Sequence, residues 1–302
     1  MKIGSHVSNN GELMLEGSAK QAAILGANCF MLYLGAPQNT FRKPFSLMHS
    51  KEMQEVINKL NISIEDVIVH APYIVNLAQN DDDKWQYAVD FITNEVKLCF
   101  MCGMKYMVLH PGAHVGMGYE YGIKRISEGL IQILNRTKET DVVICLETMA
   151  GKGTEVGCTF EQIKAIMDLV KSDRIQVCLD TCHIFDAGYD IVNHYDEVLN
   201  EFNDIISFKN LKVIHLNDSK NILGSKKDRH ENIGLGNIGF ETLHRFVVDK
   251  RFENIPKILE TPYVKDPNSN MQYEPYKDEI IMLKNGIFNE NLIEDILNSK
   301  IE

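Results

Sequence analysis

Short apolar runs alternate with longer amphipathic segments along most of this chain. The runs are rich in Val, Ile and Leu and do not alternate strictly with polar residues, which is the pattern of parallel strands buried on both faces. This pattern predicts eight strands, at residues 2–7, 29–34, 66–72, 106–110, 142–147, 175–180, 212–216 and 256–260.

The segments between these strands carry apolar residues at helical spacing. The clearest is 84–103, where Trp85, Ala88 and Ile92 begin an apolar stripe and Gly103 ends the helix. Eight strand–helix alternations predict an α/β fold of the (β/α)₈ TIM-barrel type. No change in composition divides the chain, so we expect residues 1–302 to form a single domain. The other helices are predicted near 11–25, 47–60, 118–136, 159–171, 193–206, 239–249 and 275–298.

Side chains of the kinds that bind metal ions stand at or just after the ends of the predicted strands. Because barrel strands all end at one mouth, we expect these side chains to converge there. Four carboxylates in a partly dry cavity need compensating positive charge, so divalent metal ions are expected with them. The nine residues are His70, His110, Glu147, Asp180, His183, His215, Asp228, His230 and Glu260.

Nine ligands suffice for three metal ions with three protein ligands each, the number common in catalytic zinc sites. Clustered ions of this kind clamp the oxygens of a phosphodiester in nucleases and phosphatases. Asp228 and His230 are two residues apart, and we expect them on one face of an extended segment, where both reach one ion. Asp180 and His183 are expected to serve different ions, with Cys182 between them a less favoured ligand.

Composition and charge limit the partners of the chain. The formal net charge of −11 argues against a broad nucleic-acid-binding surface. However, Lys220, Lys226, Lys227 and Arg229 cluster around two predicted ligands, and bound cations would add positive charge at the mouth. No signal peptide or apolar run of ~20 residues is visible. We therefore expect a cytoplasmic protein with no membrane partner.

The seven cysteines are an odd number and fall mostly in apolar segments, which indicates reduced thiols. Cys99 and Cys102 have C-x-x-C spacing but lie in a helical pattern without a second pair, so core packing is the preferred interpretation. His6 and His114 could line the site, orient a ligand or pack elsewhere.

Several segments resemble the endonuclease IV family of DNA repair enzymes, and the resemblance runs from Ile3 to about Leu283. The segments are HAPYIVNLA (70–78), HPGAH (110–114), LETMAG (146–151), CLDTCH (178–183), HLNDSK (215–220), DRH (228–230), GLGNIG (234–239) and LETP (259–262). The resemblance implies a monomeric TIM-barrel endonuclease that binds three zinc ions, and histidine and carboxylate ligands also accept Mn or Fe as substitutes. It implies hydrolysis 5′ to abasic sites in duplex DNA, leaving a 3′-hydroxyl and a 5′-deoxyribose phosphate, together with trimming of blocked 3′ ends.

The resemblance also implies roles for the ligands, with Glu147 and Glu260 as catalytic residues. The first zinc would be held by His70, His110 and Glu147. The second would be held by Glu147 as a bridge, with Asp180, His215 and Glu260. The third would be held by His183, Asp228 and His230.

The residues expected to contact DNA come from three loops. Tyr73 and Ile74 are expected to enter the duplex while the abasic nucleotide is extruded. Some family members carry an arginine wedge in the loop after the second strand. In this chain the aligned position is Asn39, with Arg42 three residues later, which leaves the wedge undecided. The basic residues Lys227 and Arg229 are also predicted to contact DNA.

Two other functions fit part of this pattern. A sugar isomerase or epimerase of a related barrel would need only Glu147, Asp180, His215 and Glu260, which leaves the Asp228/His230 pair without a role. A non-enzymatic binder of damaged DNA would be expected to have lost ligands, and none is missing.

Overall fold

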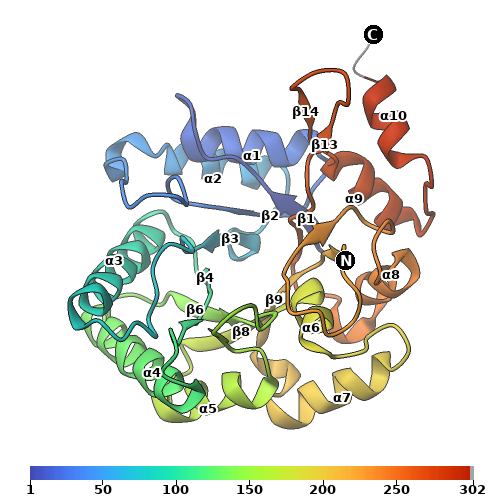
Figure 1. The fold of residues 1–302 in the computed structure, drawn as a ribbon. Coiled ribbons are helices and arrows are strands. Elements are labelled where there is room, and N and C mark those ends of the chain that lie inside the picture. The colour runs from blue at the N-terminus through green and yellow to red at the C-terminus, as the bar shows by residue number, and fades with distance from the viewer. Residues whose placement is uncertain (300–302) are drawn as a thin grey trace.

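A computed structural model describes residues 1–299, and its eight parallel strands close into a barrel surrounded by helices (Figure 1). The strands follow one another around the barrel in chain order, and β12 closes it against β1. All eight predicted strands, and the predicted barrel, are confirmed. The strands are β1 (Ile3–His6), β2 (Cys29–Leu32), β3 (Val67–His70), β4 (Tyr106–Leu109), β6 (Val143–Glu147), β8 (Ile175–Asp180), β9 (Leu211–His215) and β12 (Lys257–Leu259).

The helices form the outer ring, and several begin at a side-chain cap. Asp81 accepts a hydrogen bond from the Lys84 N–H at the start of α3, and Thr159 accepts one from Gln162 at the start of α5. The helices are α1 (Met14–Ile24), α2 (Ser50–Lys59), α3 (Asp82–Met101), α4 (Tyr119–Arg136), α5 (Phe160–Val170), α6 (Thr181–Ala187), α7 (Tyr195–Ile205), α8 (Phe240–Val248), α9 (Tyr276–Asn285) and α10 (Leu292–Asn298).

Two helix predictions were wrong. The single helix expected over 275–298 is split into α9 and α10, because Gly286 adopts a left-handed conformation with φ of 65° and ends α9. Helix α6 was not predicted at all. It is short and almost wholly buried, so it has no exposed polar face to produce a helical period.

Short elements shape the loops between the barrel and its helices. Three antiparallel pairs form: β5 (Gly112–Ala113) with β7 (Glu155–Val156), β10 (Asp218–Ser219) with β11 (His230–Glu231), and β13 (Val264–Lys265) with β14 (Gln272–Tyr273). The 3₁₀ turns are η1 (Phe45–Leu47), η2 (Ile64–Asp66), η3 (Phe208–Asn210) and η4 (Lys250–Phe252).

The hydrophobic core has two parts. The larger part lies between the barrel and the helices, and a smaller cluster fills the barrel interior with Cys29, Met31, Ile68, Val108 and Val213 among its members. All seven cysteines are free thiols, and Cys99 and Cys102 are buried in the outer core at the end of α3. Cys99 and Cys102 therefore contribute to core packing in this fold.

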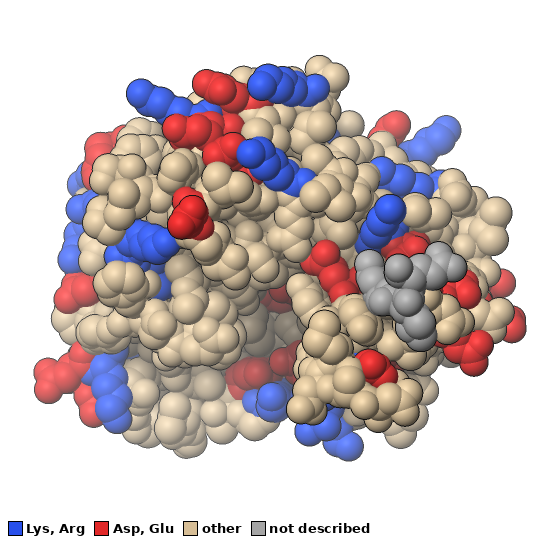
Figure 2. Space-filling model, turned by 90° about the horizontal axis from the view of Figure 1, so that it is seen from above, with Lys and Arg blue, Asp and Glu red and all other residues tan. Residues whose placement is uncertain are grey.

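Figure 2 shows one side of the molecule, on which Lys and Arg are interspersed with Asp and Glu. The acidic residues on that side thus do not form one continuous negatively charged surface. Among residues 1–299, no helix combines the length and apolar character that crossing a membrane requires.

Candidate metal centre

Glu147 lies at the centre of the barrel mouth, with four imidazoles around its carboxylate. It is the last residue of β6 and is almost wholly buried. Its Oε2 lies 3.2 Å from Nε2 of His70 and 3.1 Å from Nε2 of His110. Its Oε1 lies 3.0 Å from Nδ1 of His215 and 3.3 Å from Nδ1 of His183. The two oxygens therefore face different sets of nitrogen atoms, as a bridging carboxylate requires.

The nine predicted ligands are brought together into three overlapping or adjacent groups. In each group the ligand atoms lie within 4.8 Å of one another. Two of the groups share Glu147, so these two are adjacent in space. Two further combinations, His70 with His215 and Glu260, and Asp180 with Cys182 and His230, show how closely the groups lie. The three groups are His70, His110 and Glu147; Glu147, Asp180, His215 and Glu260; and His183, Asp228 and His230.

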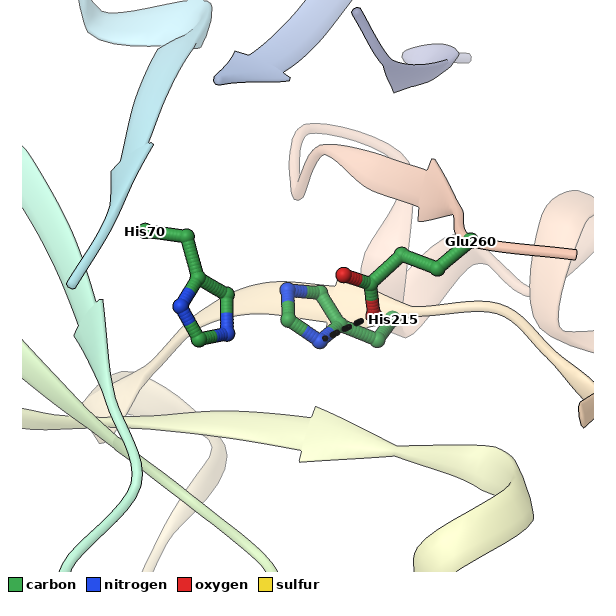
Figure 3. Close-up of side chains that lie close together, drawn as sticks. All are labelled: His70, His215 and Glu260. Atoms are coloured by element: carbon green, nitrogen blue, oxygen red, sulfur yellow. Dashed lines mark ion pairs between the residues drawn. The ribbon is translucent and has the colours of Figure 1, made fainter. Parts of the chain in front are cut away.

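Figure 3 shows how residues from three distant parts of the chain meet at this centre. His70 ends β3, His215 ends β9, and Glu260 directly follows β12. The rings of His70 and His215 are stacked with centroids 5.7 Å apart. The Glu260 Oε2 lies 3.1 Å from Nδ1 of His215. The parallel strands thus deliver these side chains to one point because they all end at the same mouth.

The third group depends on the long loop between β9 and α8. His183 comes from the first turn of α6, and its Nε2 lies 3.0 Å from Oδ1 of Asp228. The prediction that Asp228 and His230 share an extended segment was wrong in one respect. Asp228 has a φ of 53°, in the left-handed region, whereas His230 belongs to the short strand β11. A local reversal of the backbone, rather than alternation along a strand, turns the two side chains toward His183.

Asp180 and His183 fall in different groups, as predicted from their spacing. The chain turns at Asp180, which ends β8 and caps α6 by accepting a hydrogen bond from the His183 N–H at 2.7 Å. Cys182 lies between them with its sulfur near Asp180 and His230. Burial holds the pKa of the Cys182 thiol above its usual range, which disfavours the thiolate form.

Charge and burial oppose each other strongly at this centre. Burial alone would raise the pKa of Glu147, but the imidazoles of His215 and His110 hold it well below its usual range. Burial alone would lower the pKa of His183, but the carboxylates of Asp180 and Asp228 hold it well above its usual range. Glu147 is thus held in its ionised form and His183 attracts a proton, whereas burial raises the pKa of the Asp180 carboxyl. Binding of divalent cations here would release those protons.

The donor set fits divalent metal ions. Nε2 of His215 and Nε2 of His230 are both buried and have no hydrogen-bond partner among residues 1–299. A buried imidazole nitrogen without a partner is costly, and a metal ion is the natural partner among so many carboxylates. Nitrogen and oxygen donors of this kind suit Zn, Mn or Fe.

Several residues that sequence reasoning missed hold the ligands in place. The side-chain amide of Asn217 donates to Asp180 Oδ2 at 2.7 Å, and its Oδ1 accepts the backbone N–H of Glu260 at 2.8 Å. The carbonyl oxygen of Thr148 lies 2.9 Å from Nδ1 of His183. Such contacts fix ring orientation and tautomer. A polar residue two positions after the ligand His215 was the only sequence signal for Asn217.

The structure leaves two of the predicted DNA-contacting residues open to solvent beside the centre. Tyr73 and Ile74 lie in the loop after β3, with 51% and 42% of their surfaces exposed. Tyr73 lines a cavity of about 250 Å³ together with His110, Asn76 and Glu155, among others. The Tyr73 ring is therefore exposed at the surface and lines the same cavity as His110, a predicted metal ligand.

The other predicted DNA-contacting residues differ in their surroundings. Asn39, Lys227 and Arg229 are exposed. The Arg42 guanidinium is engaged within the protein, with Nε 2.7 Å from Oε1 of Glu95 and only 12% of its side chain exposed. It also donates to the backbone carbonyls of Asn39 and Phe41. Arg42 therefore holds the loop after β2 against α3 in this structure.

The two weaker histidine candidates also differ. His114 accepts a hydrogen bond at Nδ1 from the Gly118 N–H at 3.0 Å, which stabilises the turn before α4. His6 lies at the mouth, with its ring 5.0 Å from that of Tyr33, which in turn is 5.1 Å from the ring of His70. Burial lowers the pKa of His6 to about 4, so its ring is neutral near pH 7.

Comparison with known proteins identifies relatives along the whole chain. The family model of xylose isomerase-like TIM barrels matches residues 19–285. "Probable endonuclease 4" from Pediococcus pentosaceus is 50% identical over 301 residues, covering 99% of this chain and 100% of that protein. The crystal structure of endonuclease IV from Thermus thermophilus is similar with a TM-score of 0.80 and 27% identity, covering 94% of this chain and 98% of that one.

The epimerases of the same fold are more distant. A D-tagatose 3-epimerase-like protein has a TM-score of 0.69 but only 19% identity over the full length of both chains, so this likeness shows a shared barrel and no more. The full-length relative at 50% identity decides in favour of the endonuclease IV family over the epimerases. The chain belongs to the endonuclease IV family within the xylose isomerase-like TIM barrels.

Proposed function

We propose that this protein hydrolyses the phosphodiester on the 5′ side of abasic sites in duplex DNA. The products are a 3′-hydroxyl and a 5′-deoxyribose phosphate, and the same centre removes blocking groups from 3′ ends. As a member of the endonuclease IV family the chain is a nuclease of DNA repair. The proposal assigns its substrate, its bond of cleavage and the residues that act.

The observation that carries the proposal is the arrangement of nine ligand-type side chains around Glu147. Three groups of donors lie next to one another, and Glu147 belongs to two of them. Such an array accommodates up to three divalent ions, and we assign zinc to it on the basis of its imidazole and carboxylate donors. An epimerase would use the second group alone and would leave Asp228 and His230 without a function.

All nine residues would hold the metal ions, and some of them also remain accessible to the substrate. Asp180 and Glu147 are buried, whereas the side chains of Glu260 and Asp228 remain 18% and 26% exposed. Divalent ions bound here would stabilise the negative charge of the phosphate and lower the pKa of an attacking water. Glu260 would hold a metal ion at the partly exposed side of the centre and so contribute to the activation of the attacking water.

Contacts with the duplex come from loops around the mouth. We assign Tyr73 and Ile74 to the gap left by an extruded nucleotide, because both are exposed apolar side chains beside the centre. Lys227 and Arg229 flank Asp228 and are assigned to DNA phosphates. Because Arg42 is paired with Glu95, the candidate from the loop after β2 is Asn39, which is exposed and whose Oδ1 accepts the backbone N–H of Phe41 at 2.9 Å.

A labelled duplex that carries a tetrahydrofuran abasic analogue tests this function directly. The analogue has no C1′ aldehyde, so a lyase cannot cleave it by elimination, whereas a hydrolase can. We expect incision 5′ to the analogue and a 3′ end that a polymerase extends. An undamaged duplex serves as the control for non-specific cleavage. No incision of the analogue by protein loaded with zinc, or a product that cannot be extended, would reject the proposal.

A further inference from the structure

We propose that Asp186 is a positioning residue that sets metal affinity at His183, Asp228 and His230, an inference that rests on the proposed metal centre. Asp186 is fully buried in α6, three residues after His183 on the same helix. It belongs to none of the groups of metal-type donors found among residues 1–299. It acts through the backbone of the loop that carries the other two residues.

Three successive backbone N–H groups of this loop wrap around Asp186. Lys226 donates to its carbonyl oxygen at 2.9 Å. Lys227 and Asp228 donate to its Oδ2 at 3.3 and 2.9 Å. Successive N–H groups that converge on one anionic oxygen form a concave anion site, and here a side chain of the protein occupies it. The buried carboxylate of Asp186 thus finds its hydrogen-bond donors in the loop itself.

This arrangement explains two unusual backbone conformations. Lys226 and Asp228 both have left-handed φ values, 55° and 53°, although neither is glycine. Non-glycine residues keep this conformation only where their surroundings enforce it. The bonds to Asp186 are the enforcing contacts, and the conformation of Asp228 is what points its carboxylate at His183. Without Asp186, no hydrogen bond from its carboxylate would hold the loop in the conformation that points Asp228 at His183.

The second carboxylate oxygen of Asp186 reaches the strand beside His230. Its Oδ1 accepts a hydrogen bond from Ser219 Oγ at 2.7 Å, and Ser219 pairs with His230 across β10 and β11. One buried carboxylate therefore contacts the segment that carries Asp228 and the strand β10 that pairs with His230, and it lies on the helix that carries His183. Asp186 therefore fixes the positions of Asp228 and His230 relative to α6, the helix that carries His183.

Zinc titration of Asp186→Ala against a competing chelator tests the inference without any DNA. We expect the affinity for one zinc ion per chain to fall about 10- to 100-fold, the usual effect of removing a group that orients a ligand. The other ions should bind as in the parent protein. Asp186→Asn keeps one oxygen that can accept from Lys227 and Asp228, and it should restore most of the affinity.

Asp190→Ala is the matched control. Asp190 accepts two backbone N–H groups, from Val192 and Asn193, in the segment that follows α6, but it touches none of the nine predicted ligands. This variant should bind zinc as the parent does. If Asp186→Ala does not fold, as judged by circular dichroism, Asp186→Ser replaces it, because a serine side chain is too short to make both sets of contacts.

A double variant separates positioning from general stability. If Asp186 acts mainly through Asp228, then adding Asp186→Ala to an Asp228→Ala protein should lower zinc affinity by clearly less than the same substitution does in the parent protein. Unchanged affinity in the single variant, or an equal loss in both backgrounds, would overturn the inference. These titrations do not depend on DNA cleavage, so a protein that shows the expected zinc affinities but leaves abasic DNA intact would reject the proposed function alone.

Discussion

The side-chain amide of Asn217 donates to the carboxylate of Asp180 across 2.7 Å, and the same side chain accepts the backbone N–H of Glu260. Asn217 is fully buried and lies two residues after the end of β9. It therefore links the ends of β8, β9 and β12 at the level where three predicted ligands emerge. Neither Asp180 nor Glu260 could shift without breaking a buried hydrogen bond.

The first prediction follows from this link. Asn217→Ala should weaken zinc binding about 10- to 100-fold, because the carboxylate of Asp180 loses the group that orients it. Titration with a competing chelator measures the change. Asn210→Ala, which removes an amide in η3 that donates to the backbone carbonyl of Ile206, is the control and should bind zinc normally. Equal affinity in the Asn217 variant and the parent would contradict the role.

Metal content provides the second prediction. Protein purified without chelators should contain about three divalent ions per chain, since nine ligand-type side chains provide three protein ligands for each of three ions. Elemental analysis of active protein measures the number and the kind of ion. Removal of the ions with a chelator should abolish incision, and added zinc should restore it. Full activity with one ion or fewer per chain would refute the three-ion centre.

The third prediction concerns Glu260. Glu260→Gln keeps the size of the side chain but removes the charge that faces His215 and the mouth. Incision of abasic duplex should fall by roughly three orders of magnitude or more, with the fold retained. Glu241→Gln, at an exposed position of α8, is the control and should leave the rate unchanged. Near-normal turnover of the Glu260 variant with its metal intact would show that Glu260 is misassigned.

Tyr73 provides the fourth prediction. Stacking of an aromatic ring on a base contributes about 1–3 kcal/mol, so Tyr73→Ala should slow cleavage of abasic duplex by roughly 5- to 150-fold. Cleavage of a small phosphodiester should fall much less, because the reaction itself does not use the ring. Phe100→Ala is the control, since Phe100 is similarly exposed but lies near the far end of α3. Equal losses on both substrates with a lowered Tm would reject the wedge role.

The fifth prediction concerns pH and stability. Burial raises the pKa of Glu279 from its usual 4.5 to about 7. The folded state therefore holds a proton that the unfolded state releases between about pH 4.5 and 7. Stability from this group should thus be lost as the pH rises through that window, by on the order of 3 kcal/mol. Denaturant unfolding at several pH values, with chelator present, measures the loss.

A glutamine at the same position provides the comparison. In Glu279→Gln the carbonyl oxygen can accept from Asn232 and Ile233, and the amide can donate to the Thr261 hydroxyl, as a protonated carboxyl would. The variant should match the parent at about pH 5 and exceed its stability at about pH 8. A variant that is less stable than the parent at about pH 8 would show that Glu279 is ionised in the fold.

The sequence alone was sufficient for the barrel and for the set of metal-type side chains. Buried parallel strands are short continuous apolar runs, a local pattern that can be read without knowing the neighbours of each strand. Because the strands all end at one mouth, the residues after them had to converge. His70, Glu147 and His215 could therefore be predicted from their places at strand ends alone.

The tertiary structure decided what depends on contacts between distant segments. Asp228 reaches His183 only through a left-handed turn of the backbone, which no local pattern predicts for an aspartate. Arg42 is turned toward Glu95 on α3, a residue 53 positions away, and so is not free at the mouth. Asp186 carries no sequence signal that separates it from other polar residues, and the only signal for Asn217 is its place two residues after His215. Their roles exist only because the fold places their hydrogen-bond partners within reach, and that placement is a property of the packed barrel rather than of any segment.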